Sequence, residues 1–144
     1  RATLSIAQLY YGRIEEAQAS AKRAQILAAG SRLRFWAEFE LALTSALLRK
    51  PMEAIRHAET ANALRPNYRP PLRYLTALYS GAGFFTRAAG SARRLTEIED
   101  DFTPDRLVSD DAYPVSLMRK SKLLRADRIR TVQGLVTDGN PRRA

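Results

Sequence analysis

The strongest constraint on the fold is a pattern that recurs along the chain: an apolar helix end, a short break, and a new helix entered through a small alanine. The alanines are Ala17, Ala54 and Ala88. Ala54 and Ala88 are 34 residues apart, and Ala17 and Ala54 are 37 apart. We interpret the longer interval as one period plus an insertion in the connection at 28–31. A fixed period of this length indicates stacked helix-turn-helix repeats.

Apolar and small residues recur at helical spacing within the repeats. Ala54, Ala58 and Ala61 follow each other at intervals of four and three, so they share one face of a helix. Small side chains on that face allow a second helix to approach closely. Gly83 is placed to end the next apolar helix. Because alanine and leucine dominate the composition and β-branched residues are sparse, the sequence predicts an all-α fold.

The pattern resembles the tetratricopeptide repeat (TPR), a helix pair with small residues at the helix contacts, a glycine between the helices and a proline after them. The matching residues are Ser5, Gly12, Ala17 and Ala24 in the first repeat, Ala42, Ala54, Ala61 and Pro66 in the second, and Tyr79, Gly83, Phe85 and Ala88 in the third. The motif's early tryptophan is absent, and Arg49, Leu95 and Asp100 depart from it. The resemblance implies a right-handed α-solenoid of about three helix pairs over residues 1–100, divided at about 1–30, 32–66 and 67–100.

Residues 101–144 carry a different pattern, which predicts a C-terminal helical cap and tail. Thr103 and Pro104 have the residue types of an N-cap and of a first helical position, respectively. Pro114 opens another short apolar stretch, and a last helix is expected to run towards Leu135. Solenoids need a terminal element with a polar outer face, and this tail is a candidate for it.

The tail is also similar to the segment that closes TPR regions in certain bacterial regulators. The similar features are Phe102-Thr103 after an acidic residue, Tyr113-Pro114, and Gly134-Leu135 in the last helix. Those regulators contain class III adenylate or guanylate cyclase domains, or winged-helix domains, with the repeats at the C-terminus. The resemblance implies that this chain is the C-terminal, non-catalytic part of a larger bacterial signalling protein. No catalytic or DNA-binding residue is carried over to this sequence.

The TPR resemblance further implies a partner-binding groove along the first helices of the repeats. The residues at its inner-face positions are Trp36, Phe39, Glu40, Leu43, Arg73, Tyr74 and Ala77. Aromatic side chains and arginine are the types that anchor protein interfaces. We expect this surface to bind a protein or peptide partner, or a second copy of the chain in a homodimer. The alternative is that Trp36 and Phe39 pack between repeats.

The net charge of +9 raises nucleic-acid binding as an alternative function. The densest basic patch consists of Arg119, Lys120, Lys122, Arg125, Arg128 and Arg130. This patch lacks the aromatic side chains that stack on bases, and an acidic stretch at 97–111 is available to balance it. We interpret the charge as a solvated surface, with a helical nucleic-acid-binding domain as the second reading.

Residue types that carry catalysis or bind cofactors are scarce. The chain has no cysteine, no serine stands in a Gly-x-Ser-x-Gly nucleophile motif, and the one histidine is His57. We expect His57 to be a surface or partly packed residue, and we expect no enzyme activity, cofactor or metal site in this segment. No stretch approaches 18 consecutive apolar residues, which predicts no transmembrane span. The lack of cysteine fits a reducing compartment, so the expected location is cytoplasmic.

Overall fold

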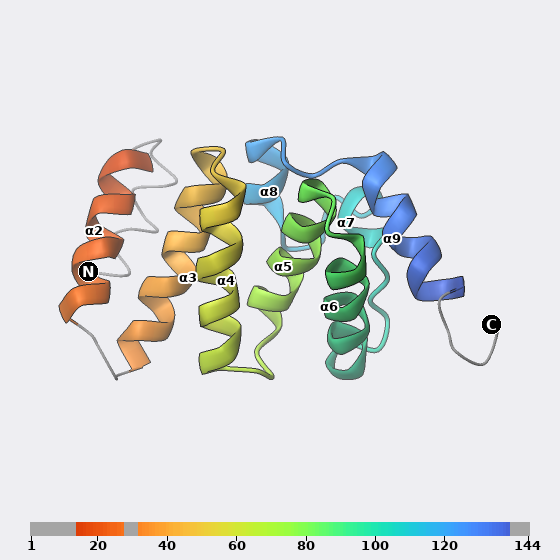
Figure 1. The fold of residues 1–144 in the computed structure, drawn as a ribbon, viewed down its shortest axis with the longest axis horizontal. Coiled ribbons are helices and arrows are strands. Elements are labelled where there is room, and N and C mark those ends of the chain that lie inside the picture. The colour runs from red at the N-terminus through yellow and green to blue at the C-terminus, as the bar shows by residue number, and fades with distance from the viewer. Residues whose placement is uncertain (1–13, 28–31, 139–144) are drawn as a thin grey trace. The chain divides into compact units, whose positions relative to one another are not determined.

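The computed structural model describes residues 14–27 and 32–138, and their regular structure is helical throughout (Figure 1). In chain order the helices are α2 (Ile14–Leu27), α3 (Arg32–Leu47), α4 (Pro51–Leu64), α5 (Arg69–Ala82), α6 (Phe85–Ile98), α7 (Arg106–Ser109), α8 (Ser116–Ser121) and α9 (Ala126–Asp138). No strand occurs among these described residues, and the predicted all-α class is confirmed. The helices divide between two compact units, Arg1–Pro66 and Asn67–Ala144.

In the first unit, α3 and α4 form an antiparallel pair and α2 packs against α3 (Figure 1). A short connection at 48–50 joins the two helices, and the backbone N–H of Lys50 donates to Ser45 O at 2.8 Å. Arg49 stands at the glycine position of the motif and adopts the left-handed φ of 60°. The turn therefore has the conformation that a glycine would supply without strain.

Small side chains on α2 and α4 are buried in the core of this unit. Ala54, Ala58 and Ala61 are all fully buried, as are Ala17 and Ala21 on α2. The prediction that Ala54 is buried is confirmed. Ser5, Gly12 and the connection at 28–31, which the sequence pattern assigned to the first repeat, lie outside the described residues.

In the second unit, α5 and α6 form an antiparallel pair around the expected turn at Gly83 (Figure 1). Gly83 has a φ of 85°, its N–H donates to Ser80 O at 3.1 Å, and Phe84 N–H donates to Tyr79 O at 2.9 Å. This is the glycine C-cap that the sequence predicted. Ala88, also predicted to be buried, has no exposed surface.

The chain after α6 belongs to the same compact unit. Helix α9 packs against α6 and α5, and its Ile129 and Val132 are fully buried. At Gly81 on α5, a Cβ would overlap the backbone carbonyl of Leu123, so the segment before α9 passes directly against that helix. Leu135, towards which the last helix was expected to run, lies in α9 and is 38% exposed.

The predicted start of the first tail helix is wrong by a few residues. Helix α7 begins at Arg106, with Asp105 as its N-cap, whereas Thr103 and Pro104 were expected to begin it. Arg106 N–H donates to Thr103 O at 3.0 Å, and Leu107 N–H donates to Pro104 O at 3.1 Å. These i-to-i+3 bonds make 103–107 a tight turn that leads into the helix.

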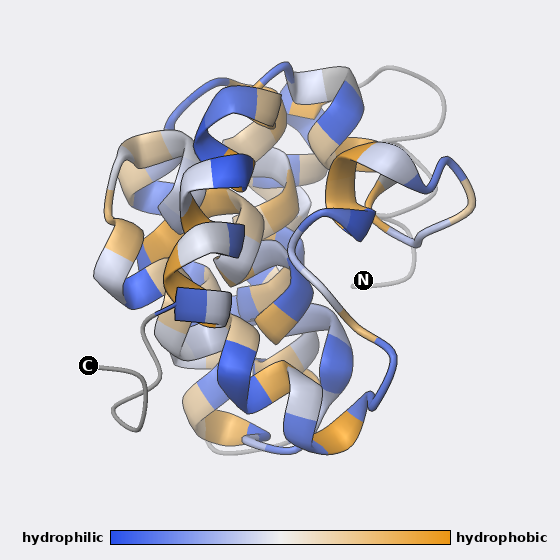
Figure 2. Cartoon of the chain, turned by 90° about the vertical axis from the view of Figure 1, so that its right-hand side faces the viewer, coloured by the Kyte–Doolittle hydropathy of each residue, from blue (hydrophilic) through white to orange (hydrophobic). Residues whose placement is uncertain are grey.

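Hydrophilic and hydrophobic residues follow each other along individual helices, which are therefore amphipathic (Figure 2). In the described part of the chain, no helix combines the length and the apolar character that crossing a membrane requires. The apolar faces instead supply the buried core of each unit.

Candidate functional site

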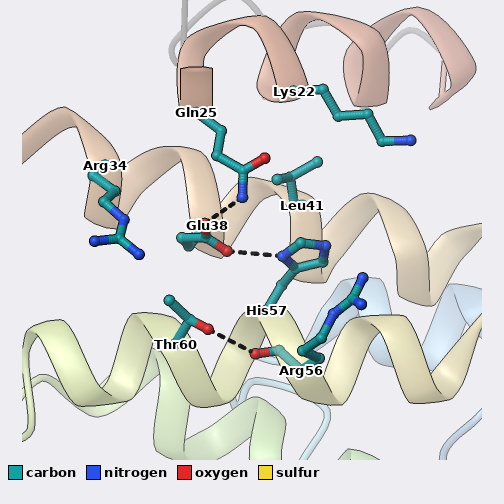
Figure 3. Close-up of a pocket in the computed structure, with 8 residues that line it drawn as sticks. All are labelled: Lys22, Gln25, Arg34, Glu38, Leu41, Arg56, His57 and Thr60. Carbon is teal, nitrogen blue, oxygen red and sulfur yellow. Dashed lines mark hydrogen bonds and ion pairs between the residues drawn. The ribbon is translucent and has the colours of Figure 1, made fainter. Parts of the chain in front are cut away.

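A pocket of about 510 Å³ opens between α2, α3 and α4 of the first unit (Figure 3). Its volume lies within the range that small-ligand and side-chain binding pockets occupy. The residues that line it are Lys22 and Gln25 from α2, Arg34, Glu38 and Leu41 from α3, and Arg56, His57 and Thr60 from α4.

The helical repeat explains why these side chains meet. Arg34, Glu38 and Leu41 follow each other at intervals of four and three along α3, so they project from one face of that helix. His57 and Thr60 on α4, and the two α2 residues, are likewise three apart. Each helix thus turns one polar stripe towards the pocket, and the stripe lies beside the alanine face that packs the helices together.

The inner wall of the pocket contains a buried carboxylate. Glu38 is 3% exposed, its Oε1 lies 2.8 Å from His57 Nδ1, and its Oε2 accepts a hydrogen bond of 2.5 Å from Gln25 Nε2. An ionised carboxylate only accepts, so His57 Nδ1 is the donor. A buried charge needs such partners, and here both oxygens have one. The Nε2 of His57 has no hydrogen-bond partner within the described part of the chain.

The remaining charges of the pocket are positive. Lys22, Arg34 and Arg56 pair with no acidic side chain among residues 14–27 and 32–138. Three cations against one carboxylate leave a net charge of +2, or +3 when His57 is protonated. In the view of Figure 3, Lys22 and Arg56 lie on the His57 side of the pocket and Arg34 lies on the other side of Glu38. A concave surface with one sign of charge attracts counter-ions.

The predicted groove residues of the first unit lie on α3. Trp36 is half-buried, and its ring meets that of Phe35 edge-on at 5.1 Å between centroids. The Arg65 guanidinium lies 4.7 Å from the centroid of Phe35 and 5.9 Å from that of Trp36. The other predicted residues of this helix are buried, namely Phe39, Glu40 and Leu43. Trp36 is therefore the groove candidate on α3 that keeps exposed surface.

The predicted groove residues of the second unit lie on α5, where Tyr74 and Ala77 are buried. Arg73 donates to Glu99 Oε1 at 2.6 Å from Nη2 and to the Tyr113 hydroxyl at 3.2 Å from Nε. Tyr113 in turn donates to Glu99 Oε2 at 2.6 Å. The carboxylate that Arg73 binds is thus supplied by its own unit. That the α3 and α5 residues line one groove stays a prediction.

This network shifts the ionisation of its members. Burial lowers the pKa of Arg73, but the hydrogen bonds to Glu99 and Tyr113 more than offset this effect. The pKa of Arg73 therefore lies above its ordinary value. Burial, followed by the hydrogen bond to Glu99, raises the pKa of Tyr113 well above the usual range for a phenol. The network therefore stays as an ion pair with a neutral tyrosine at physiological pH. Glu99 belongs to the acidic stretch at 97–111, and the structure buries it at 8% exposure.

Part of the predicted basic patch holds the tail together. Arg119 donates to the carbonyl oxygens of Asp110 at 2.6 Å and of Leu107 and Tyr113 at 3.3 Å each. Arg128 donates to the carbonyl of Gly81. Of the others, Arg125 pairs with Asp127 at 3.5 Å, Lys122 and Arg130 are exposed, and the side chain of Lys120 lies outside what the structure describes. Use of this patch for nucleic acid stays a prediction.

Sequence reasoning missed the basic pocket. Its central pair, Glu38 and His57, lies on two helices and is separated by 19 residues, an interval that no helical spacing connects. One signal was present: Glu38 stands inside the apolar run of 35–43. A carboxylate in such a run must find a partner when the helix is buried, and the sequence offers one histidine.

Comparison with protein-family models, with curated proteins and with solved structures finds no match. Among the described residues, no group of three or more histidine, cysteine, aspartate and glutamate side chains is arranged to hold a metal ion. Function is therefore inferred from the helix packing and from the chemistry of the pocket.

Proposed function

We propose that this chain is a non-catalytic protein-interaction module built of TPR-like helix pairs that continue as a right-handed solenoid, with the segment after residue 100 as its cap. Its role is to bind a protein or peptide partner or a second copy of itself. The tail's resemblance to bacterial regulators extends the proposal to the C-terminal part of a cytoplasmic signalling protein of the cyclase-like or winged-helix kind.

One observation carries the proposal. Helices α2, α4 and α6 present the same buried strip, with residues spaced by four and then three: Ala17, Ala21 and Ala24; Ala54, Ala58 and Ala61; Ala88, Ala92 and Leu95. Helix α4 packs against α3, and α6 packs against α5. Repetition of one closely packed unit is typical of proteins that build extended binding surfaces from repeats.

Trp36 offers a direct test of partner binding. It is the single tryptophan of the chain and it is half-buried on α3, so its fluorescence reports on the predicted groove alone. A partner identified by crosslinking in cells, then purified, should shift the Trp36 emission saturably on titration. Trp36→Ala should weaken binding by at least about tenfold, the loss expected for an aromatic interface anchor.

Met52→Ala is the matched control, because Met52 is 58% exposed on α4 and lies outside the predicted groove. It should bind the partner like the wild type. If Trp36→Ala lowers the melting temperature and leaves partner affinity unchanged, Trp36 is a packing residue and the groove is wrong. A purified chain that instead binds duplex DNA or RNA, with affinity falling steeply as salt rises, favours the nucleic-acid alternative.

A further inference from the structure

The geometry of the basic pocket points to a specific ligand chemistry. We infer that the pocket between α2, α3 and α4 binds a carboxylate or phosphate group carried on a partner peptide, so that the module recognises acidic segments. This inference rests on the proposed function, which supplies the peptide. It concerns a surface formed by Lys22 and Gln25, by Arg34, Glu38 and Leu41, and by Arg56, His57 and Thr60, and this surface does not include the groove residues.

The cations of the pocket are available to a ligand. Arg34 and Arg56 present planar guanidinium groups, which bind carboxylates and phosphates through two parallel N–H···O bonds. Lys22 adds a point charge from α2. None of the three forms an ion pair within the described chain, so an incoming anion displaces no internal partner.

Glu38 repels an anionic ligand less than an unpaired carboxylate would, because its oxygens are engaged by other side chains. Both of its oxygens are bound, by His57 at 2.8 Å and by Gln25 at 2.5 Å. These bonds fix the imidazole ring with Nδ1 towards Glu38, which leaves Nε2 for a ligand. When His57 is protonated, Nε2 carries a hydrogen and donates to the anion.

The size of the pocket favours a group carried on a peptide over a free ion. A volume of about 510 Å³ is much larger than a phosphate ion needs. The methylene stems of Lys22 and Arg34 offer apolar contact to the rest of a side chain and its backbone. A free inorganic anion makes none of these contacts.

The test uses His57 as its reporter, because it is the only histidine and its ring signals in an NMR spectrum come from one site. The whole chain is titrated with hexaglutamate, with hexaglutamine as the uncharged peptide and with inorganic phosphate as the free ion. Hexaglutamate should shift the His57 signals saturably, phosphate should bind more weakly, and hexaglutamine should produce no saturable shift.

The double variant R34Q/R56Q should bind hexaglutamate at least about tenfold more weakly, because two charge-assisted contacts are lost. The control R32Q/K50Q removes the same charge from exposed positions outside the pocket and should stay within about twofold of the wild type. The variant R34K/R56K keeps the positive charges but loses the paired N–H donors of the guanidinium groups. Its affinity for hexaglutamate should fall between those of R34Q/R56Q and the control. Circular dichroism and melting curves verify that each variant is folded.

The inference is overturned if hexaglutamate leaves the His57 signals unchanged, or if the pocket and control variants bind it equally well. Phosphate binding without peptide binding also overturns it, since the site would then take a free ion. These outcomes leave the interaction module intact wherever the Trp36 titration detects a partner. If a partner shifts the Trp36 emission and binds R34Q/R56Q as tightly as the wild type, the pocket inference fails while the proposed function holds.

Discussion

Removal of the Glu99 carboxylate tests whether the Arg73–Glu99–Tyr113 network holds the second unit together. The Glu99→Ala variant leaves the Arg73 guanidinium without its anion and the Tyr113 hydroxyl without its acceptor. Breaking a buried ion pair by removing one partner destabilises a protein by about 3–5 kcal/mol. The Arg73 side chain is 16% exposed and regains some hydration, which favours the lower end of that range.

The lost tyrosine hydrogen bond adds about 1 kcal/mol. The expected total is about 3–4 kcal/mol, which corresponds to a melting temperature lower by about 6–16 °C for a chain of this size. Glu99→Gln keeps one acceptor oxygen and the side-chain volume, so it should lose about half as much. The matched control is Glu97→Ala, in the last turn of α6 just before Glu99. Glu97 forms an exposed pair with Arg94 at 3.4 Å, and its removal should change stability by about 0.5 kcal/mol or less.

The assay is urea unfolding followed by circular dichroism, together with amide hydrogen exchange analysed separately for peptides of α4 and α6. Exchange should accelerate in α6 in the Glu99→Ala variant. A double-mutant cycle with Tyr113→Phe should give a coupling energy of about 0.5–3 kcal/mol. If Glu99→Ala and Glu97→Ala lose the same stability, or if the cycle gives no coupling, the network does not stabilise the unit and the reasoning is refuted.

Further predictions concern close contacts, turns and pH. Gly81→Ala should destabilise by about 1–3 kcal/mol because its Cβ overlaps the Leu123 carbonyl, whereas Gly90→Ala, with open space around it, should stabilise by about 0.5–1 kcal/mol; equal melting temperatures would contradict this. Ala54→Leu should lower the urea midpoint by overpacking a fully buried contact, while Ala63→Leu at an exposed position of the same helix should leave it nearly unchanged. Arg49→Gly should raise stability by up to about 1 kcal/mol by relieving its left-handed φ, and a lower melting temperature would argue against strain there. The pKa of Tyr113 is raised in the folded state, so the contribution of Tyr113 to the free energy of unfolding is complete below about pH 10 and is lost as the pH rises through the folded-state pKa. From about pH 9 upwards, the urea midpoint of Tyr113→Phe should therefore fall less steeply than that of the wild type.

The sequence by itself determined the helical elements and the turns between them. The interval of 34 residues between Ala54 and Ala88, and the glycine at position 83, predicted two helix pairs with a turn in each, and the structure confirms these turns and buries both alanines. Such features are local: spacing fixes which face of a helix is small and apolar, and a left-handed C-cap favours glycine. The start of α7 was missed because Thr103-Pro104 suits a tight turn as well as a helix N-terminus.

Tertiary structure alone decided which charged residues meet. Glu38 and His57 are 19 residues apart, and Arg73 and Tyr113 are 40 apart. No periodicity along one helix relates positions on different helices; their pairing follows from how the helices pack against one another. The same packing left Lys22, Arg34 and Arg56 around the pocket without an ion pair among the described residues. The sequence specified the helices and their contact faces, while the pocket arose where the polar stripes of three helices converged.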